Sequence, residues 1–402
     1  MRVTNYDIKI LFLALLLCVG ITAYARRKHK PVILPVYEQP SVVVEDDGAV
    51  TFRYCGEGKH VYLLTDFLFV DEDTIFYTDH SHKIKMEKQS NGCFYVTTRP
   101  VSPETYTYCF RVDGKRVPDP LNNDTAWERL HKWNVVTVGG TPETDIYLQP
   151  KKQGELIRAK WYSTEEKIYR RVNIYLPAAI SHQQSPITNH QSFPVLYLIH
   201  GINGYEGSWT ERGRAIQVME NLAAQGKIEP TILVMPDCNV GPHEDRPSHH
   251  TLFNNIMHYP RLQHDHRIEH AVSELIRMVD SIYPVSGNQA IAGLSDGARL
   301  AANIANENPG HFNAVGMFSP VVHKSQLPCD SCTDTRYFIY AGKADFFINN
   351  SRRFYHRLQK QRGVERDKNT PSAHLTIRGS GHNWRNWRRF GADFLTKWQG
   401  KE

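Results

Sequence analysis

The sequence predicts a small all-β sandwich followed by a larger α/β domain built on a mostly parallel sheet. Short β-rich runs separated by turn signals fill residues 31 to about 148, a pattern typical of an antiparallel sandwich. After about residue 150, short apolar runs alternate with helical stretches, which favours parallel strands covered by helices on both faces. The composition agrees with a globular chain, since 41% of the 402 residues are hydrophobic and 22% are charged.

The strands of the first segment are expected where β-branched and aromatic residues gather between turn sequences. Asp-Gly, Gly-Glu-Gly and Asn-Gly stand between these runs, and such sequences form tight turns. No long helical period interrupts them. The predicted strands are residues 42–44, 50–54, 61–64, 93–97, 105–112 and 135–138.

The second segment has buried-type strands and longer helical stretches. Its predicted strands are residues 172–176, 195–199, 232–235, 289–292 and 337–341, and its predicted helices are residues 215–225, 267–283, 297–307 and 350–361. We therefore expect three parts: a signal peptide at residues 1–25, a β-sandwich at 26–149 and an α/β domain at 150–402.

The N-terminus is typical of a secretory signal peptide. Arg2 and Lys9 precede an apolar stretch that ends in a small-x-small sequence at Ala25. The stretch is shorter than the roughly 20 residues that cross a bilayer, so we expect export to the periplasm, the outer surface or the medium, without stable membrane insertion. A signal anchor is the alternative, because residues 26–30 are basic or His and such flanks tend to stay in the cytoplasm.

Charge and cysteine content exclude some functions. A formal charge of +6 over 402 residues is not the clustered basic field of a nucleic-acid-binding protein. An oxidising compartment would permit disulfides among the cysteines, and Cys329 and Cys332 are close enough in sequence for a local bridge. The remaining pairing stays open. No cysteines and histidines stand at zinc-finger spacing, so we expect no metal site.

A serine nucleophile is predicted at Ser295, within Gly293-Leu294-Ser295-Asp296-Gly297. The motif follows an apolar strand-like run and opens a helical run. A tight turn between a strand and a helix projects the serine hydroxyl above the sheet, and the flanking glycines avoid clashes. The context makes this motif more specific than the pattern alone.

A general base and an acid should follow the serine along the chain, because hydrolases with this strand–turn–helix motif run in the order Ser, acid, His. His382 lies in a Gly-flanked loop near the C-terminus, and Asp345 lies just past the strand predicted at residues 337–341. Asp330 and Asp334 precede that strand and would lie at the wrong edge of the sheet. We therefore predict a catalytic triad of Ser295, Asp345 and His382.

Two further groups complete the predicted site. A tetrahedral intermediate needs backbone donors, and the loop after the strand at residues 195–199 should supply one. We assign the oxyanion hole to the N–H groups of Ile202 and Asp296. Trp209 and Trp384 are predicted to contact the substrate, because their rings could stack on a sugar or a phenol.

By these residues and motifs, the second segment resembles carbohydrate esterase family 1, which contains feruloyl and acetyl-xylan esterases and enterochelin-esterase-like proteins. The resemblance covers nearly all of residues 150–398 and rests on residues 169–176, 193–209, the serine motif, the Asp345 loop and residues 381–384. It implies an α/β-hydrolase fold and cofactor-free hydrolysis of a carbohydrate ester or aryl ester, with plant cell-wall polysaccharide as the expected partner. The alternative substrate is a siderophore.

The first segment resembles the immunoglobulin-like or family 48 carbohydrate-binding modules that precede such esterases, chiefly at residues 106–110, 112–114 and 119–123. Two residues depart from the esterase pattern. Asp296 stands where an uncharged residue is usual, and its carboxylate should oppose an oxyanion unless it points away. Asn203 replaces a more usual glycine. A glycan-binding protein without activity is therefore the alternative outside the enzymes.

Overall fold

The computed structural model describes residues 39–70, 82–128, 131–181, 192–239, 266–322, 334–362 and 373–400. The predicted signal peptide at residues 1–25 and the Cys329–Cys332 pair lie outside these ranges. By its internal contacts the chain divides into Met1–Pro40 and one compact unit, Ser41–Glu402. Both folded segments that the sequence predicts therefore belong to the same unit.

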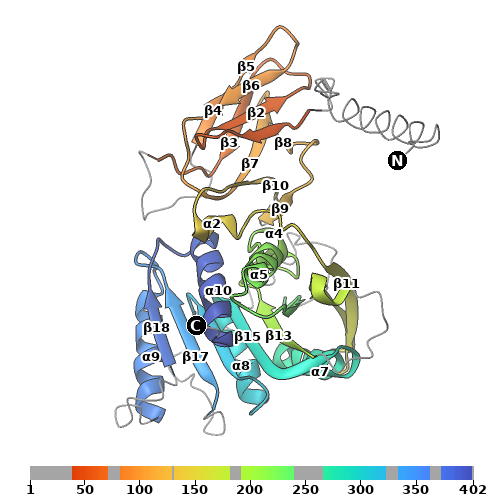
Figure 1. Cartoon of the computed structure of the whole chain (residues 1–402), viewed down its shortest axis with the longest axis vertical. Helices are drawn as coiled ribbons and strands as arrows, with labels where there is room; N and C mark the ends of the chain where they lie inside the picture. The colour runs from red at the N-terminus through yellow and green to blue at the C-terminus, as the bar shows by residue number, and fades with distance from the viewer. Residues whose placement is uncertain are drawn as a thin grey trace, which may run out of the picture. The chain divides into compact units, whose positions relative to one another are not determined.

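The first segment forms two antiparallel sheets (Figure 1). One sheet has the order β1-β2-β6-β5, and the other has the order β4-β3-β7-β10-β9 with β8 paired to β7. The strands are β1 (Val42–Val44), β2 (Val50–Tyr54), β3 (Val61–Thr65), β4 (His82–Lys85), β5 (Glu87–Lys88), β6 (Phe94–Thr97), β7 (Glu104–Val112), β8 (Lys115–Val117), β9 (Thr125–Glu128) and β10 (His131–Val138). All six strands predicted for this segment are present.

The two sheets share one apolar core, which makes the segment a sandwich. Phe52 and Phe94 of the first sheet and Leu63 and Tyr108 of the second belong to a single buried cluster. The rings of Phe52 and Tyr108 meet edge to face with their centroids 4.7 Å apart, an arrangement that stabilises aromatic pairs beyond their burial.

A disulfide joins Cys55 to Cys93. These residues lie next to the paired strands β2 and β6, so the bond ties together neighbouring strands of the first sheet. Among the described cysteines, Cys109 and Cys238 are free thiols and both are buried. The sequence had left this pairing open.

The second segment is built on an eight-stranded sheet with the order β11-β12-β14-β13-β15-β16-β17-β18. The β11–β12 and β12–β14 pairs are antiparallel, and the other five pairs are parallel. The sheet is therefore mixed. Its strands are β11 (Glu155–Ser163), β12 (Ile168–Leu176), β13 (Phe193–Ile199), β14 (Ile232–Pro236), β15 (Val285–Leu294), β16 (Ala314–Phe318), β17 (Arg336–Ala341) and β18 (Ala373–Ile377).

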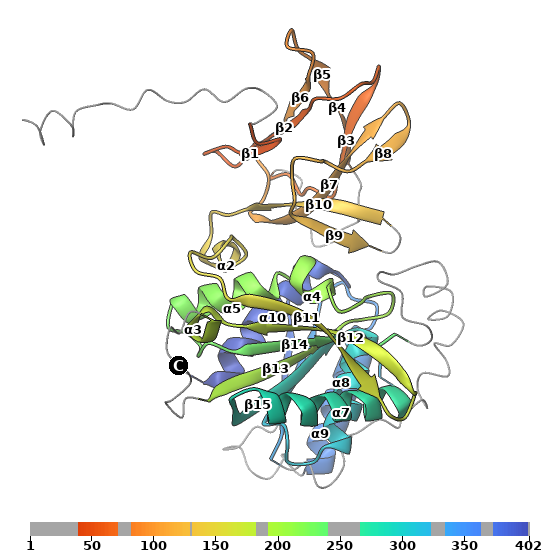
Figure 2. The ribbon, with the colours of Figure 1, turned by 90° about the vertical axis from the view of Figure 1, so that its right-hand side faces the viewer.

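Helices cover both faces of this sheet (Figure 2). Apolar side chains of α7 (His266–Ile282), α8 (Asp296–Glu307) and α9 (Ile348–Arg362) join one core cluster, and those of α5 (Ala215–Ala224) and α10 (Trp384–Gln399) join the other. The short helices are α2 (Pro142–Asp145), α3 (Ala178–Ser181) and α4 (Ser208–Glu211). None of the helices in the described ranges is long and apolar enough to cross a membrane.

Strand β13 contributes side chains to both core clusters. Tyr197 and Ile199 belong to the first cluster, whereas Leu196 and Leu198 belong to the second, because successive side chains of a strand point to opposite faces. This two-sided burial explains why the strand reads as a continuous apolar run rather than as an alternating one.

The loops that carry the predicted site residues all leave the sheet at the carboxyl ends of its parallel strands. The parallel strands β13, β15, β16, β17 and β18 are in register near their carboxyl ends, where Ile199 pairs with Gly293, Leu294 with Phe318, and Ala341 with Ile377. The loops that leave these strands therefore start side by side. In open α/β sheets, ligands bind at this edge.

Candidate active site

Ser295 occupies a strained turn between β15 and α8. Its φ is 55° and its ψ is −119°, a conformation that side-chain-bearing residues rarely adopt and that often marks a functional site. Its N–H donates to the carbonyl of Phe318 at 2.8 Å. A Cβ on Gly293 would lie 2.2 Å from the Gly297 carbonyl oxygen, and one on Gly297 would lie 2.1 Å from that of His200. The turn therefore requires both glycines of the motif.

His382 lies between Ser295 and Asp345. Its Nε2 is 3.0 Å from Ser295 Oγ, and its Nδ1 is 3.2 Å from each carboxylate oxygen of Asp345. With a carboxylate beside Nδ1, the neutral ring carries its proton on Nδ1 and accepts the serine proton at Nε2. The structure thus brings together all three residues of the predicted triad, in an arrangement that can remove a proton from the serine hydroxyl.

The Asp345 carboxylate is buried and accepts several hydrogen bonds. The side chain is fully shielded from solvent, and burial by itself raises the pKa of this carboxyl. The hydrogen bond and charge of His382, together with hydrogen bonds from the Ser319 hydroxyl and the Phe347 N–H, lower the pKa by more. The net pKa lies below the ordinary value, so Asp345 is ionised at neutral pH and can accept a hydrogen bond from His382 Nδ1.

Ser319 is a supporting residue that the sequence reasoning missed. Its hydroxyl donates to Asp345 and accepts from the indole N–H of Trp387 at 3.1 Å. Ser319 follows β16, a strand that was not predicted, and its φ is 52°. No sequence signal distinguishes this serine from others in the chain.

The predicted oxyanion hole lies beside the serine. A Cβ on Gly201 would be 3.3 Å from Ser295 Cβ, so the loop after β13 passes directly by the nucleophile. The N–H groups of Ile202 and Asp296 donate to no other described residue. Both are therefore free of competing acceptors within the described part of the chain.

The charge of Asp296 is compensated by its neighbour on α8. Arg299 Nε lies 2.8 Å from Asp296 Oδ1, and Arg299 Nη2 lies 3.2 Å from Oδ2. Both side chains are largely buried, with exposed fractions of 14% for Asp296 and 4% for Arg299. Paired charge-assisted hydrogen bonds of this kind fix a carboxylate firmly. The carboxylate is thus paired with Arg299, which answers the concern that it would oppose an oxyanion.

A cavity of about 260 Å³ opens onto Ser295 and His382. Ile202, Asn203 and Trp384 line it, so one of the two tryptophans predicted to contact the substrate faces this space. Small-molecule sites in proteins typically have volumes of roughly 300–1,000 Å³, and this cavity is slightly smaller. No group of three or more His, Cys, Asp or Glu side chains in the described ranges could hold a metal ion.

The prediction for Trp209 is wrong. The residue is only 2% exposed, and its indole N–H donates to the carbonyl of Ile199 at 3.0 Å. Its ring meets that of Trp384 edge to face, with centroids 5.4 Å apart. Trp209 is therefore a core residue that supports Trp384 from behind.

Other aromatic rings surround His382. The ring centroids of Trp387, Phe346 and Phe347 lie 5.0, 5.1 and 5.3 Å from the imidazole. Phe346 is 76% exposed. The sequence reasoning identified none of these three, although Phe346 and Phe347 directly follow Asp345.

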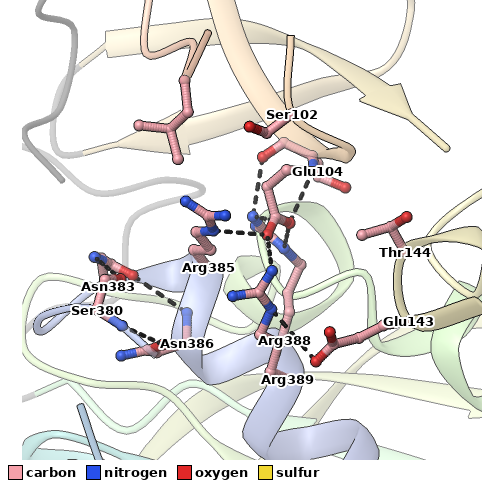
Figure 3. Close-up of polar contacts among 12 residues, drawn as sticks. Ser102, Glu104, Glu143, Thr144, Ser380, Asn383, Arg385, Asn386, Arg388 and Arg389 are labelled. Carbon is pink, nitrogen blue, oxygen red and sulfur yellow. Dashed lines mark hydrogen bonds and ion pairs between the residues drawn. The ribbon is translucent and has the colours of Figure 1, made fainter. Parts of the chain in front are cut away.

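Helix α10 begins two residues after His382, and its first turns are held by Glu104 of β7 (Figure 3). The Glu104 carboxylate lies within ion-pairing distance of three guanidinium groups of α10: Arg388 at 2.9 Å, Arg385 at 3.4 Å and Arg389 at 3.5 Å. Glu104 is 1% exposed. A buried carboxylate of the sandwich thus anchors the helix that follows the histidine.

The strand–serine–helix turn and the Asp–His–Ser series define a protein of the α/β-hydrolase class. A family model described as "Putative esterase" matches residues 163–390, which is more than half of the chain. The chain therefore belongs to this esterase family.

The chain is also similar to individual proteins. An endo-1,4-beta-xylanase/feruloyl esterase of Xylanibacter ruminicola is 27% identical over 240 residues, which are 58% of this chain and 31% of that protein. The match thus spans about a third of the relative. The enterobactin esterase of Shigella flexneri, solved in the presence of enterobactin, aligns with 18% identity and a TM-score of 0.55 over 87% of this chain and 92% of that one. A ferulic acid esterase of Anaeromyces mucronatus aligns with 18% identity and a TM-score of 0.49 over 64% and 95%.

Proposed function

We propose that the chain is a serine esterase that works through an acyl-enzyme formed on Ser295. The observation that carries the proposal is the position of His382, whose ring nitrogens lie 3.0 Å from Ser295 Oγ and 3.2 Å from the Asp345 carboxylate. Ester cleavage needs a base that activates the hydroxyl and an acid that protonates the leaving alcohol. One imidazole in this position serves both steps.

In the first half-reaction Ser295 Oγ attacks the ester carbonyl carbon while His382 Nε2 takes the hydroxyl proton. Asp345 stabilises the resulting imidazolium. The carbonyl oxygen becomes an oxyanion, and the N–H groups of Ile202 and Asp296 are its donors. The ester C–O bond then breaks, and His382 returns the proton to the leaving alcohol. Water repeats the sequence on the acyl-enzyme and releases the acid, without a cofactor.

The proposed substrates are feruloyl or acetyl esters of plant cell-wall xylan. Support comes from the Xylanibacter ruminicola relative, whose name combines a xylanase with a feruloyl esterase. The presence of Trp384 in the cavity also suits a ring-bearing substrate, because aromatic faces stack on phenols and sugars. The sandwich of residues 26–149 is proposed to belong to the same enzyme as a module ahead of the esterase domain at 150–402.

A siderophore ester is the second candidate substrate. The Shigella flexneri enterobactin esterase aligns over 87% of this chain, so the similarity extends beyond the esterase domain into the sandwich. This extent of the alignment is the observation that supports a siderophore substrate.

We also propose that the protein is exported and that residues 1–25 are its signal peptide. The Cys55–Cys93 disulfide supports this proposal, because disulfides form and persist mainly in oxidising compartments.

The test is hydrolysis by the purified full chain of methyl ferulate, acetylated xylan and enterobactin, each with Ser295→Ala as the control. We expect turnover of methyl ferulate or acetylated xylan to exceed that of enterobactin, and Ser295→Ala to abolish it. Preferential cleavage of enterobactin would favour the siderophore substrate. Absence of activity on all three esters and on p-nitrophenyl acetate would refute the proposed function.

A further inference from the structure

The cavity at Ser295 has one wall that comes from the sandwich. Trp127 of β9 lines the same space as Ser295, His382 and Trp384. Every other described residue of the lining lies beyond residue 200. The cavity is therefore completed by a residue whose strand belongs to the first segment.

Trp127 is held in place by residues next to the oxyanion loop. Its backbone N–H donates to Glu211 Oε2 at 2.9 Å, and the same oxygen accepts from the Tyr205 hydroxyl. Glu211 is the last residue of α4, which follows the loop that contains Gly201 and Ile202. Strand β9 is thus tied directly to the segment that shapes the oxyanion side of the cavity.

Two buried or half-buried ion pairs fix the strands around Trp127. Arg214, at the start of α5, binds both carboxylate oxygens of Asp124 at 2.8 Å, one residue before β9 begins. Arg388, which pairs with Glu104 (Figure 3), also donates to the carbonyls of Thr105 and Arg212 at 2.9 Å. Arg214 and Asp124 pair through two parallel hydrogen bonds, and a fork of this kind imposes a defined geometry. These contacts hold the sandwich edge in a fixed position beside the catalytic serine.

We propose that Trp127 is a specificity-determining residue that contacts the ring of the ester substrate, so that the sandwich forms part of the substrate site. This inference rests on the proposed serine esterase function. An indole that lines the cavity offers a flat apolar surface to a phenolic acyl group or a sugar ring. A small aliphatic ester has no ring to contact it.

The experiment compares Trp127→Ala and Trp127→Phe with the unaltered full chain on two esters. Methyl ferulate carries a ring, and ethyl acetate, followed by acid release in a pH-stat, carries none. We expect Trp127→Ala to raise KM for methyl ferulate about tenfold, which corresponds to about 1.4 kcal/mol. For ethyl acetate, kcat and KM of Trp127→Ala should stay within about twofold of the values for the unaltered chain. Trp127→Phe should retain most of the preference for methyl ferulate over ethyl acetate.

Tyr169→Ala is the matched control, because Tyr169 is an exposed aromatic residue outside the cavity lining. This variant should leave kcat and KM unchanged for both esters. An unchanged ratio of kcat/KM for the two esters in both Trp127 variants would overturn the inference, as would an equal loss on both esters in Trp127→Phe. If the unaltered chain hydrolyses neither of these esters, nor acetylated xylan, enterobactin or p-nitrophenyl acetate, the proposed function itself fails. The two failures are therefore distinguishable.

Discussion

Replacing Glu104 by Gln tests whether the buried carboxylate holds the sandwich to helix α10. The side chain is shielded, and its partners Arg388, Arg385 and Arg389 have exposed fractions of 5%, 12% and 16%. Removing one partner of a buried pair costs about 3–5 kcal/mol, because the remaining charge is left uncompensated. Gln keeps one carbonyl acceptor, and Arg388 keeps the carbonyls of Thr105 and Arg212. We therefore expect a loss of about 3 kcal/mol.

The measurement is urea unfolding followed by tryptophan fluorescence, with the free energy of unfolding extrapolated to water. Glu143→Gln is the matched control, because Glu143 also pairs with Arg389, at 3.5 Å, but is 53% exposed. Exposed pairs contribute about 0–1 kcal/mol, so this variant should stay close to the unaltered protein.

Equal stabilities of Glu104→Gln and Glu143→Gln would refute the reasoning. That result would mean that the three guanidinium groups are solvated or satisfied without Glu104.

Three further predictions concern the triad, the α4 carboxylate and the disulfide. Asp345→Asn should lower kcat by about 10⁴-fold with little change in KM, because an amide cannot hold the imidazole tautomer or stabilise the imidazolium; steady-state kinetics measures this. Burial and the charge of Glu206 raise the pKa of Glu211 from 4.5 to about 7. The unfolded chain loses this proton first, so Glu211 lowers stability as pH rises from about 4.5 to 7. Relative to Glu211→Gln, the unaltered protein should lose up to about 3 kcal/mol over that interval in urea unfolding. Replacing Cys55 and Cys93 by Ser opens a link across a sequence separation of 38, which should cost about 4 kcal/mol by the loop-entropy model.

Each of these has a contradicting result. A loss below about tenfold in Asp345→Asn would remove that residue from the catalytic series. A pH-independent difference between Glu211→Gln and the unaltered protein would show that its carboxyl titrates normally. Equal stability of the Cys55/Cys93 double variant, with and without reductant, would show that the bond does not constrain the fold.

The triad could be predicted from the sequence because each member follows a parallel strand of the same sheet. In a parallel sheet the carboxyl ends of the strands lie along the same side. The order of the residues along the chain, together with the apolar run before each one, therefore suffices to place Ser295, Asp345 and His382 on that side. Ser295 was the easiest residue to locate, because the tight turn around it requires glycines and these are visible in the local sequence.

Contacts between distant segments could not be predicted in the same way. Glu104 and Arg388 are 284 positions apart, and Trp127 and Glu211 are 84 positions apart. Neither pair has a local pattern, because the contact exists only after the sandwich and the esterase sheet have folded. The error at Trp209 has the same origin, since burial of an aromatic side chain depends on packing that a single sequence does not reveal.

Three strands of the second segment were also missed, namely β11, β16 and the edge strand β18. Strand β11 is an edge strand in which exposed charged residues alternate with more buried apolar ones, whereas the strands predicted for this segment were continuous apolar runs. Strand β16 contains Gly316, whose added Cβ would lie 2.8 Å from Ala292 Cβ. Close packing therefore requires a glycine there, although glycine in a strand interior weakens the sequence signal.

The central claim is that an acyl group is transferred to Ser295. The most direct measurement is mass spectrometry of the full chain quenched in acid during turnover of p-nitrophenyl acetate, with peptide mapping of the adduct. We predict an acetyl adduct on the peptide that contains Ser295, and neither adduct nor turnover in Ser295→Ala. Turnover that persists in Ser295→Ala, or an adduct confined to another residue, would contradict the account.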